Sequence, residues 1–64
     1  MWVEGVSYEI PWTRMKRGQA IFIPCLDPPR ARAQILAITK RLKLKILMKV
    51  VIHERIRGLR IWRI

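Results

Sequence analysis

The chain has 64 residues, with 14 Lys and Arg against 4 Asp and Glu, and a formal net charge of +10 at pH 7. A chain of this length makes a single small domain, residues 1–64, and leaves no room for a two-domain enzyme with a closed cleft. The hydrophobic fraction of 52% argues against a disordered basic tail, and the composition excludes collagen, coiled coils and disulfide scaffolds.

The charge is concentrated in the second half of the chain. Residues 1–27 carry no net charge, whereas residues 28–64 hold eleven basic residues against Glu54 alone. Self-repulsion of this size is costly without a polyanionic partner. The imbalance therefore favours a protein that binds a polyanion.

Sequence features of export and of membrane insertion are missing. The lone Cys25 forms no internal disulfide, and an idle, buried thiol is expected. The first residues lack the basic and long apolar segments of a signal peptide, and no stretch approaches the ~20 apolar residues of a membrane span. We expect a cytoplasmic protein with no membrane partner.

The first third of the chain predicts one strand after an irregular start. Residues 1–10 have weak periodicity and are expected to form a flexible arm or an edge strand. Pro11 and the basic cluster 14–18 indicate a turn. The short apolar run 19–23, closed by Pro24, is rich in β-branched and aromatic residues and predicts a strand.

The middle of the chain predicts a helix over residues 28–43. Asp27 is placed to cap it, and the prolines that follow suit a first helical turn. Four apolar residues fall on one helical face, as a buried stripe requires: Ala31, Ile35, Ile38 and Leu42.

The last third predicts an antiparallel hairpin. Residues 45–55 alternate, and the following apolar residues should pack under the helix: Ile46, Met48, Val50 and Ile52. Arg57-Gly58 is expected to form the tight turn, and residues 59–64 the returning strand. The predicted fold is α+β, a β-α-β-β unit with one helix packed on a short antiparallel sheet, with an extra N-terminal strand as an option.

The hairpin face that the helix leaves free is the main candidate binding surface. It is expected to carry five basic or histidine side chains and one tryptophan: Lys45, Lys49, His53, Arg55, Arg60 and Trp62. Cations replace counterions on phosphates, and an indole offers a π-face to a base. The other interpretation is a solvated set of charges, with Trp62 folded onto a sheet edge.

A second basic cluster, Arg14, Lys16 and Arg17, is expected in the loop before the first strand. Such a cluster can clamp a phosphate backbone. A solvated turn is an equal alternative.

Nothing in the chain predicts catalysis. His53 is the single histidine, and with one cysteine there are too few ligands for a metal site. The carboxylates are too scattered for an acid–base pair, and no nucleophile motif or phosphate loop is present. We expect no enzyme, no catalytic residue, no metal and no cofactor.

Three tryptophans are many for so small a chain: Trp2, Trp12 and Trp62. They serve the core or an interface, since a thin core is often completed by a second copy. Unpaired sheet edges invite the same solution. We expect a homodimer.

Two segments together resemble a pattern in short uncharacterised bacteriophage proteins. These are Ile10–Pro24, with its Met-x-x-Gly and its Phe-Ile-Pro strand end, and the closing Gly58–Arg63, with Gly-x-Arg-x-Trp-Arg. The departures are Ala20-Ile21, where that pattern has a small polar and then an aromatic residue, and a more basic, proline-led helix. The resemblance implies a bacteriophage protein that acts in the host cytoplasm, and it transfers no catalytic residue.

Together these features predict a non-enzymatic, phage-type protein that binds DNA or RNA mainly through the phosphate backbone. The alternative is a small phage effector that covers an acidic surface of a host or phage protein, with charge for steering and a tryptophan as anchor.

Overall fold

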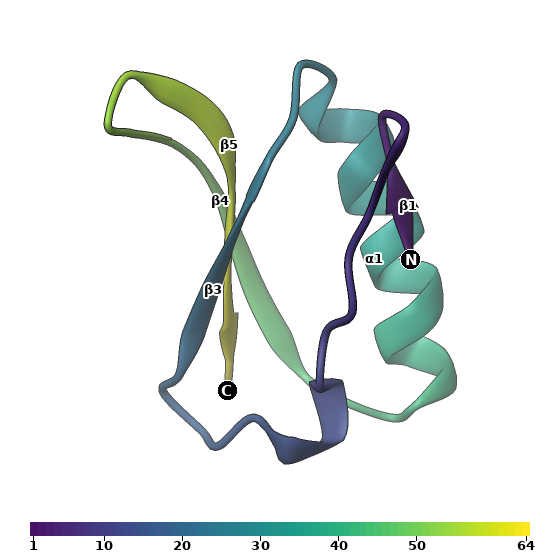
Figure 1. Cartoon of the computed structure of the whole chain (residues 1–64). Coiled ribbons are helices and arrows are strands. Elements are labelled where there is room, and N and C mark those ends of the chain that lie inside the picture. Colours follow the sequence, from purple (N-terminus) through teal and green to yellow (C-terminus); the bar gives the residue numbers. More distant parts are fainter.

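The computed structural model describes residues 1–64 and has the predicted α+β architecture. Its elements are β1 (Trp2–Val3), β2 (Val6–Ser7), the 3-10 turn η1 (Trp12–Arg14), β3 (Ala20–Pro24), α1 (Pro28–Arg41), β4 (Ile46–His53) and β5 (Ile56–Arg63). The main sheet is antiparallel with strand order β3-β5-β4. Helix α1 and the N-terminal segment lie on one side of this sheet (Figure 1).

Helix α1 begins where the sequence predicts. The Asp27 carboxylate accepts a hydrogen bond from the Arg30 backbone N–H at 3.3 Å, and prolines occupy the first turn. The helix ends at Arg41, two residues before the predicted end, because Lys43 adopts a positive φ of 58° that turns the chain toward β4. Leu42, predicted in the buried stripe, is consequently exposed.

The N-terminal residues form a hairpin of their own. In place of the arm or edge strand expected over 1–10, β1 pairs only with β2, and Met1 and Tyr8 exchange backbone hydrogen bonds at its base. The Glu4 carboxylate accepts from the backbone N–H groups of Leu26 and Asp27, at 2.7 and 2.8 Å. Each strand has two residues, which is too short to produce a visible alternation in the sequence.

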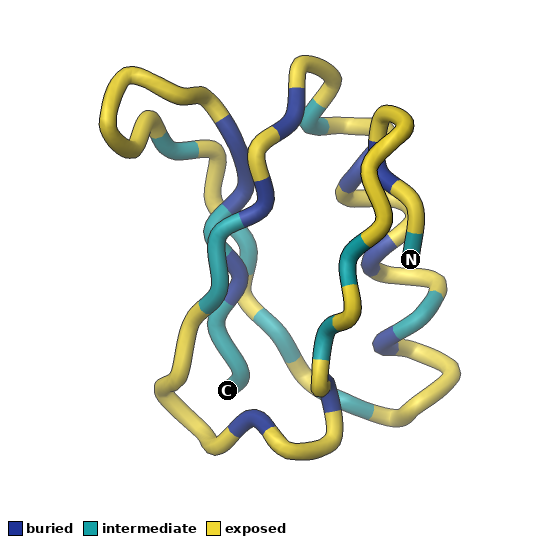
Figure 2. The backbone as a smooth tube through the Cα atoms, in the orientation of Figure 1, coloured by how far each residue is buried: buried dark blue, intermediate teal, exposed yellow.

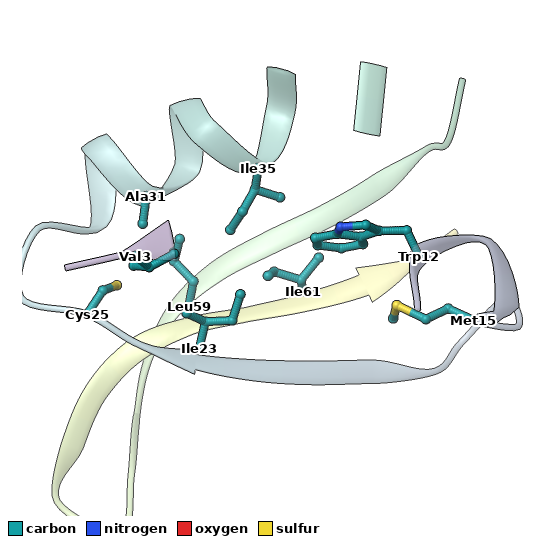
Figure 3. Packing of buried hydrophobic residues seen from close by; sticks show 9 residues of the cluster. All are labelled: Val3, Trp12, Met15, Ile23, Cys25, Ala31, Ile35, Leu59 and Ile61. Atoms are coloured by element: carbon teal, nitrogen blue, oxygen red, sulfur yellow. The ribbon is translucent and has the colours of Figure 1, made fainter. Parts of the chain in front are cut away.

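The core lies entirely on the helix side of the sheet. Nine side chains form it: Val3, Trp12, Met15, Ile23, Cys25, Ala31, Ile35, Leu59 and Ile61. Figure 3 shows Ala31 and Ile35 of α1 pointing at Leu59 and Ile61 of the central strand, with Trp12 closing one end. This face of the sheet is therefore used for folding wherever the helix and the N-terminal segment cover it.

The predicted turn at Arg57-Gly58 is wrong. The two-residue turn is Glu54-Arg55, with φ of 50° and 67°, and Gly58 lies within β5 opposite Pro24. A two-residue hairpin turn of this kind needs positive φ at both positions, a geometry that Asn and Gly adopt more readily. Strand register overrides local turn preference here, because it places the core residues of β5 under the helix.

Gly58 is required because the Phe22 ring approaches it closely, and not because it forms a turn. A Cβ added there would stand 2.7 Å from Cε2 and Cζ of Phe22 and would also meet the carbonyl oxygen of Ile23. The ring of Phe22 thus occupies the space above this glycine, as aromatic side chains do across strands.

The end of the β4–β5 hairpin extends beyond the helix. Ile46 and Met48 pack against the core as predicted, but Val50 and Ile52 are 51% and 70% exposed, so the prediction that they lie under the helix is wrong. The two strands curl away from α1 at this end, and their turn is exposed throughout (Figures 1 and 2). The alternation of residues in a strand shows on which face of the sheet each one lies. It does not show how far along that face the helix extends.

Candidate nucleic-acid interface

The sheet face opposite α1 is uncovered, and we call it the open face. Alternate residues of a strand point to opposite sides of the sheet. Leu59 and Ile61 are buried on the helix side. Arg60, which lies between them, and Trp62, which follows, therefore point away from the helix. By strand register the open face carries Ala20, Phe22, Leu47, Lys49, Val51, His53, Ile56, Arg60 and Trp62. No element lies over these side chains (Figure 1).

The middle of the open face combines cations with aromatic rings. Phe22, Arg60 and Lys49 are direct neighbours across the three strands. The His53 ring lies 5.5 Å from the Phe22 ring, centroid to centroid, at an interplanar angle of 54°. An Nη of Arg60 lies 3.4 Å from Nδ1 of His53. These contacts hold Phe22, His53 and Arg60 together as one cluster, with Lys49 opposite Arg60 on the neighbouring strand.

Trp62 lies in the next row of the same face. Its neighbours across the strands are Ala20 and Leu47, and it is partly exposed. Trp62 and Arg60 are two residues apart on β5, so both side chains leave the central strand on the open face.

The structure gathers four of the six hairpin residues that the sequence selects: Lys49, His53, Arg60 and Trp62. Arg55 lies in the turn at the far end of the hairpin, and Lys45 precedes β4 at the opposite end. Lys45 adjoins a shallow hollow shared with Leu36 and Lys40 of α1, so it sits at the rim rather than on the face.

Phe22 is the functional candidate that sequence reasoning misses. It lies inside an apolar run, between Ile21, which packs against the core, and Ile23, which is buried. A continuous apolar run predicts burial on both faces. The run is an edge strand with one open face, and the alternation of Ile21 and Ile23 around Phe22 is the feature that would have placed the ring there.

The predicted loop cluster is divided. Arg14 ends η1 and borders a hollow near Ile38, on the helix side of the sheet. Lys16 and Arg17 lie in the turn that enters β3, where Gly18 donates a backbone hydrogen bond to Arg63. This turn adjoins the end of the sheet that holds Trp62, so two of the three cations are exposed near that end of the open face.

The cations have no carboxylate partners. None of the 14 Lys and Arg side chains lies within ion-pairing distance of a carboxylate, and the single contact of this type joins His53 to Glu54 at 4.0 Å. Glu4 and Asp27 are instead bound to backbone N–H groups. No acidic side chain projects from the open face itself, and Glu54 in the adjoining turn contacts only His53, so the field over Lys49 and Arg60 is positive.

Two other features bear on the kind of site. No group of three or more His, Cys, Asp or Glu side chains gathers where a metal ion could be held. Helix α1 is neither long enough nor apolar enough to cross a bilayer.

Comparison with known proteins gives no relative. No protein-family model, curated protein or solved structure matches the chain. Function is therefore inferred from the residues of this chain and their arrangement.

Proposed function

We propose that this protein binds nucleic acid through the phosphate backbone, without catalysing a reaction. The observation that supports the proposal best is the open face, where Arg60 projects from the central strand and Lys49 from the neighbouring strand, and no Lys or Arg is neutralised by a carboxylate. The resemblance to bacteriophage proteins adds the setting that we propose, the cytoplasm of an infected host.

Counterion release supplies the driving force. A polyanion binds to unpaired cations because each phosphate contact frees a condensed counterion. Ion pairs within the protein would compete with phosphate for the same cations, and none of the Lys or Arg side chains forms one. The net charge of +10 also steers a polyanion toward the protein before contact.

The rim of the open face lengthens the contact. Lys16 and Arg17 lie at the end next to Trp62, and Arg55 lies at the hairpin end. Backbone contacts distributed in this way fix the position of a strand without reading its sequence. Arg14, on the helix side, is left out of this contact.

Charge removal on the open face tests the proposal. Lys49→Gln and Arg60→Gln should each weaken binding equally across sequences and reduce the slope of log K against log salt by about one phosphate contact. The matched controls are Lys40→Gln and Arg41→Gln, which remove the same charges from exposed positions on α1. Equal losses in all four variants would contradict a face-specific contact.

A second candidate is an effector that covers an acidic protein surface, because unpaired cations suit carboxylates as well as phosphates. Nuclease treatment separates the two candidates. Material captured from host lysate by the tagged protein should be lost after nuclease if nucleic acid is the partner. The effector would be favoured if a captured acidic protein stays bound after nuclease treatment and also binds the purified tagged protein with the same affinity.

A homodimer forms part of the proposal. Val50, Ile52 and Ile56 are all at least 51% exposed at the hairpin end, and β4 is an edge strand of the sheet. Exposed branched side chains next to an unpaired edge favour pairing with a second copy. Sedimentation velocity should show a dimer in the wild type and a monomer in Ile52→Lys, whereas a wild-type monomer at all concentrations would contradict it.

A further inference from the structure

We infer that the open face is built for single-stranded nucleic acid, with bases stacked on Phe22 and Trp62 and the backbone held by Arg60 and Lys49. This inference rests on the proposed function and specifies its ligand. It follows from the placement of the rings, their support and the shape of the sheet.

The two rings lie on one face of the sheet, with the Phe22 ring over Gly58, on the side of Arg60 away from Trp62. Phe22 on β3 pairs with Arg60 on β5, and Trp62 is the next residue of β5 on the same side. Phe22 and Trp62 are therefore a diagonal pair, and such pairs lie roughly 7–8 Å apart at the backbone. Arg60 is the cross-strand partner of Phe22, and its guanidinium extends toward His53 near the hairpin end of the open face.

Phe22 is held in position from two sides. Its ring occupies the space above Gly58, where even a methyl group would stand 2.7 Å from ring carbons. The His53 ring packs against it at 5.5 Å, and His53 in turn contacts Arg60 at 3.4 Å. A ring fixed in this way loses little further freedom when a base stacks on it.

Among nucleic acids, a partly exposed aromatic ring on a surface binds best to a ligand that offers a π-face. In a duplex the bases are stacked inside, and only their edges reach the grooves. In a single strand the bases can be splayed out and stacked on aromatic side chains, next to cations that follow the backbone. The rings of the open face therefore fit a single strand.

The shape of the face leads to the same ligand. The major groove of DNA admits a helix or a two-stranded ribbon. The Phe22, Arg60 and Lys49 row spans three strands, so this cluster cannot enter a groove as a unit. A single strand can lie across it without such a constraint.

Fluorescence anisotropy with three labelled probes tests the inference: oligo(dT), oligo(U) and a DNA duplex with the same number of phosphates. The wild type should bind a single-stranded probe more tightly than the duplex, and the two single-stranded probes distinguish DNA from RNA. Phe22→Leu and Trp62→Leu should each weaken single-strand binding by at least roughly fivefold with an unchanged salt slope, since each removes one stacking platform.

Matched variants keep the test interpretable. Trp2→Leu removes an indole that is 66% exposed on the helix side and should leave binding unchanged. Phe22→Tyr and Trp62→Phe keep a π-face and should retain most of the affinity, which a general loss of folding would not allow. Base stacking should also quench tryptophan emission in Trp2→Leu but not in Trp62→Leu.

The outcomes separate this inference from the proposed function. If no probe binds at low salt, the proposed function fails and the inference fails with it. If the duplex binds as tightly as the single strands, or if Phe22→Leu and Trp62→Leu bind like the wild type, the inference is wrong and phosphate binding stands.

Discussion

Replacing Gly58 with alanine should destabilise the fold by direct overlap between strands. The new Cβ would stand 2.7 Å from two carbons of the Phe22 ring, whereas ordinary contact begins at 3.4 Å, so the ring must move by about 0.7 Å. The carbonyl oxygen of Ile23 is also in the way, and it belongs to the backbone of β3, which cannot rotate aside. Overpacking of this kind costs about 1–3 kcal/mol.

A loss of about 2 kcal/mol is a large part of the roughly 3–10 kcal/mol expected for a domain of this size. It should lower Tm by roughly 8–16 °C in a melt followed by circular dichroism. The control is Gly18→Asn, because Gly18 has open space around it and a φ of +88° that asparagine tolerates. A Gly58→Ala protein that melts within about 2 °C of the wild type would refute the packing argument, since 1 kcal/mol alone shifts Tm by more.

Two further predictions concern the junction between the N-terminal hairpin and β3. Burial, with the nearby negative charge of Glu4, raises the pKa of the Cys25 thiol above 9.0. The native state then holds this proton more firmly than the unfolded state does. The contribution of the thiol to the free energy of unfolding is fully present below about pH 9 and is lost as pH rises through the native pKa of the thiol. The free energy of urea unfolding, measured below and above the native pKa of the thiol, should decline with pH in the wild type and decline less in Cys25→Ala. Equal declines in the two proteins would contradict this prediction. Glu4→Gln removes the anionic acceptor of the Leu26 and Asp27 N–H groups and should cost about 1 kcal/mol in the same assay, with the exposed Glu9→Gln as control.

The order of the main elements could be predicted because each has a strong local cause. Asp27 and the two prolines that follow fix the start of α1, and alternation over β4 identifies the hairpin. The turn could not be predicted, because its position depends on which residues of β5 reach the core. Gly58, read as a turn residue, is explained only by the Phe22 ring on another strand.

Part of the candidate site was predictable from the sequence, because strand alternation is a local property. Lys49, His53, Arg60 and Trp62 share a face through strand alternation, which is visible in the sequence. The contribution of Phe22 depends on β3 lying at the edge of the sheet next to β5, and that is a property of topology. The missing ion pairs likewise follow from three-dimensional placement, since the sequence shows how many carboxylates exist but not what they bind.

The most direct test of the central claim is the affinity of the wild-type protein for labelled nucleic acid across a salt series. Contacts from Lys49, Arg60 and the rim cations Lys16, Arg17 and Arg55 predict tight binding at low salt and a loss of affinity with a slope near −0.7 per phosphate contact for a single strand, or about −3.5 for five contacts. Anisotropy that stays flat at low salt with both single-stranded and duplex probes would contradict nucleic-acid binding.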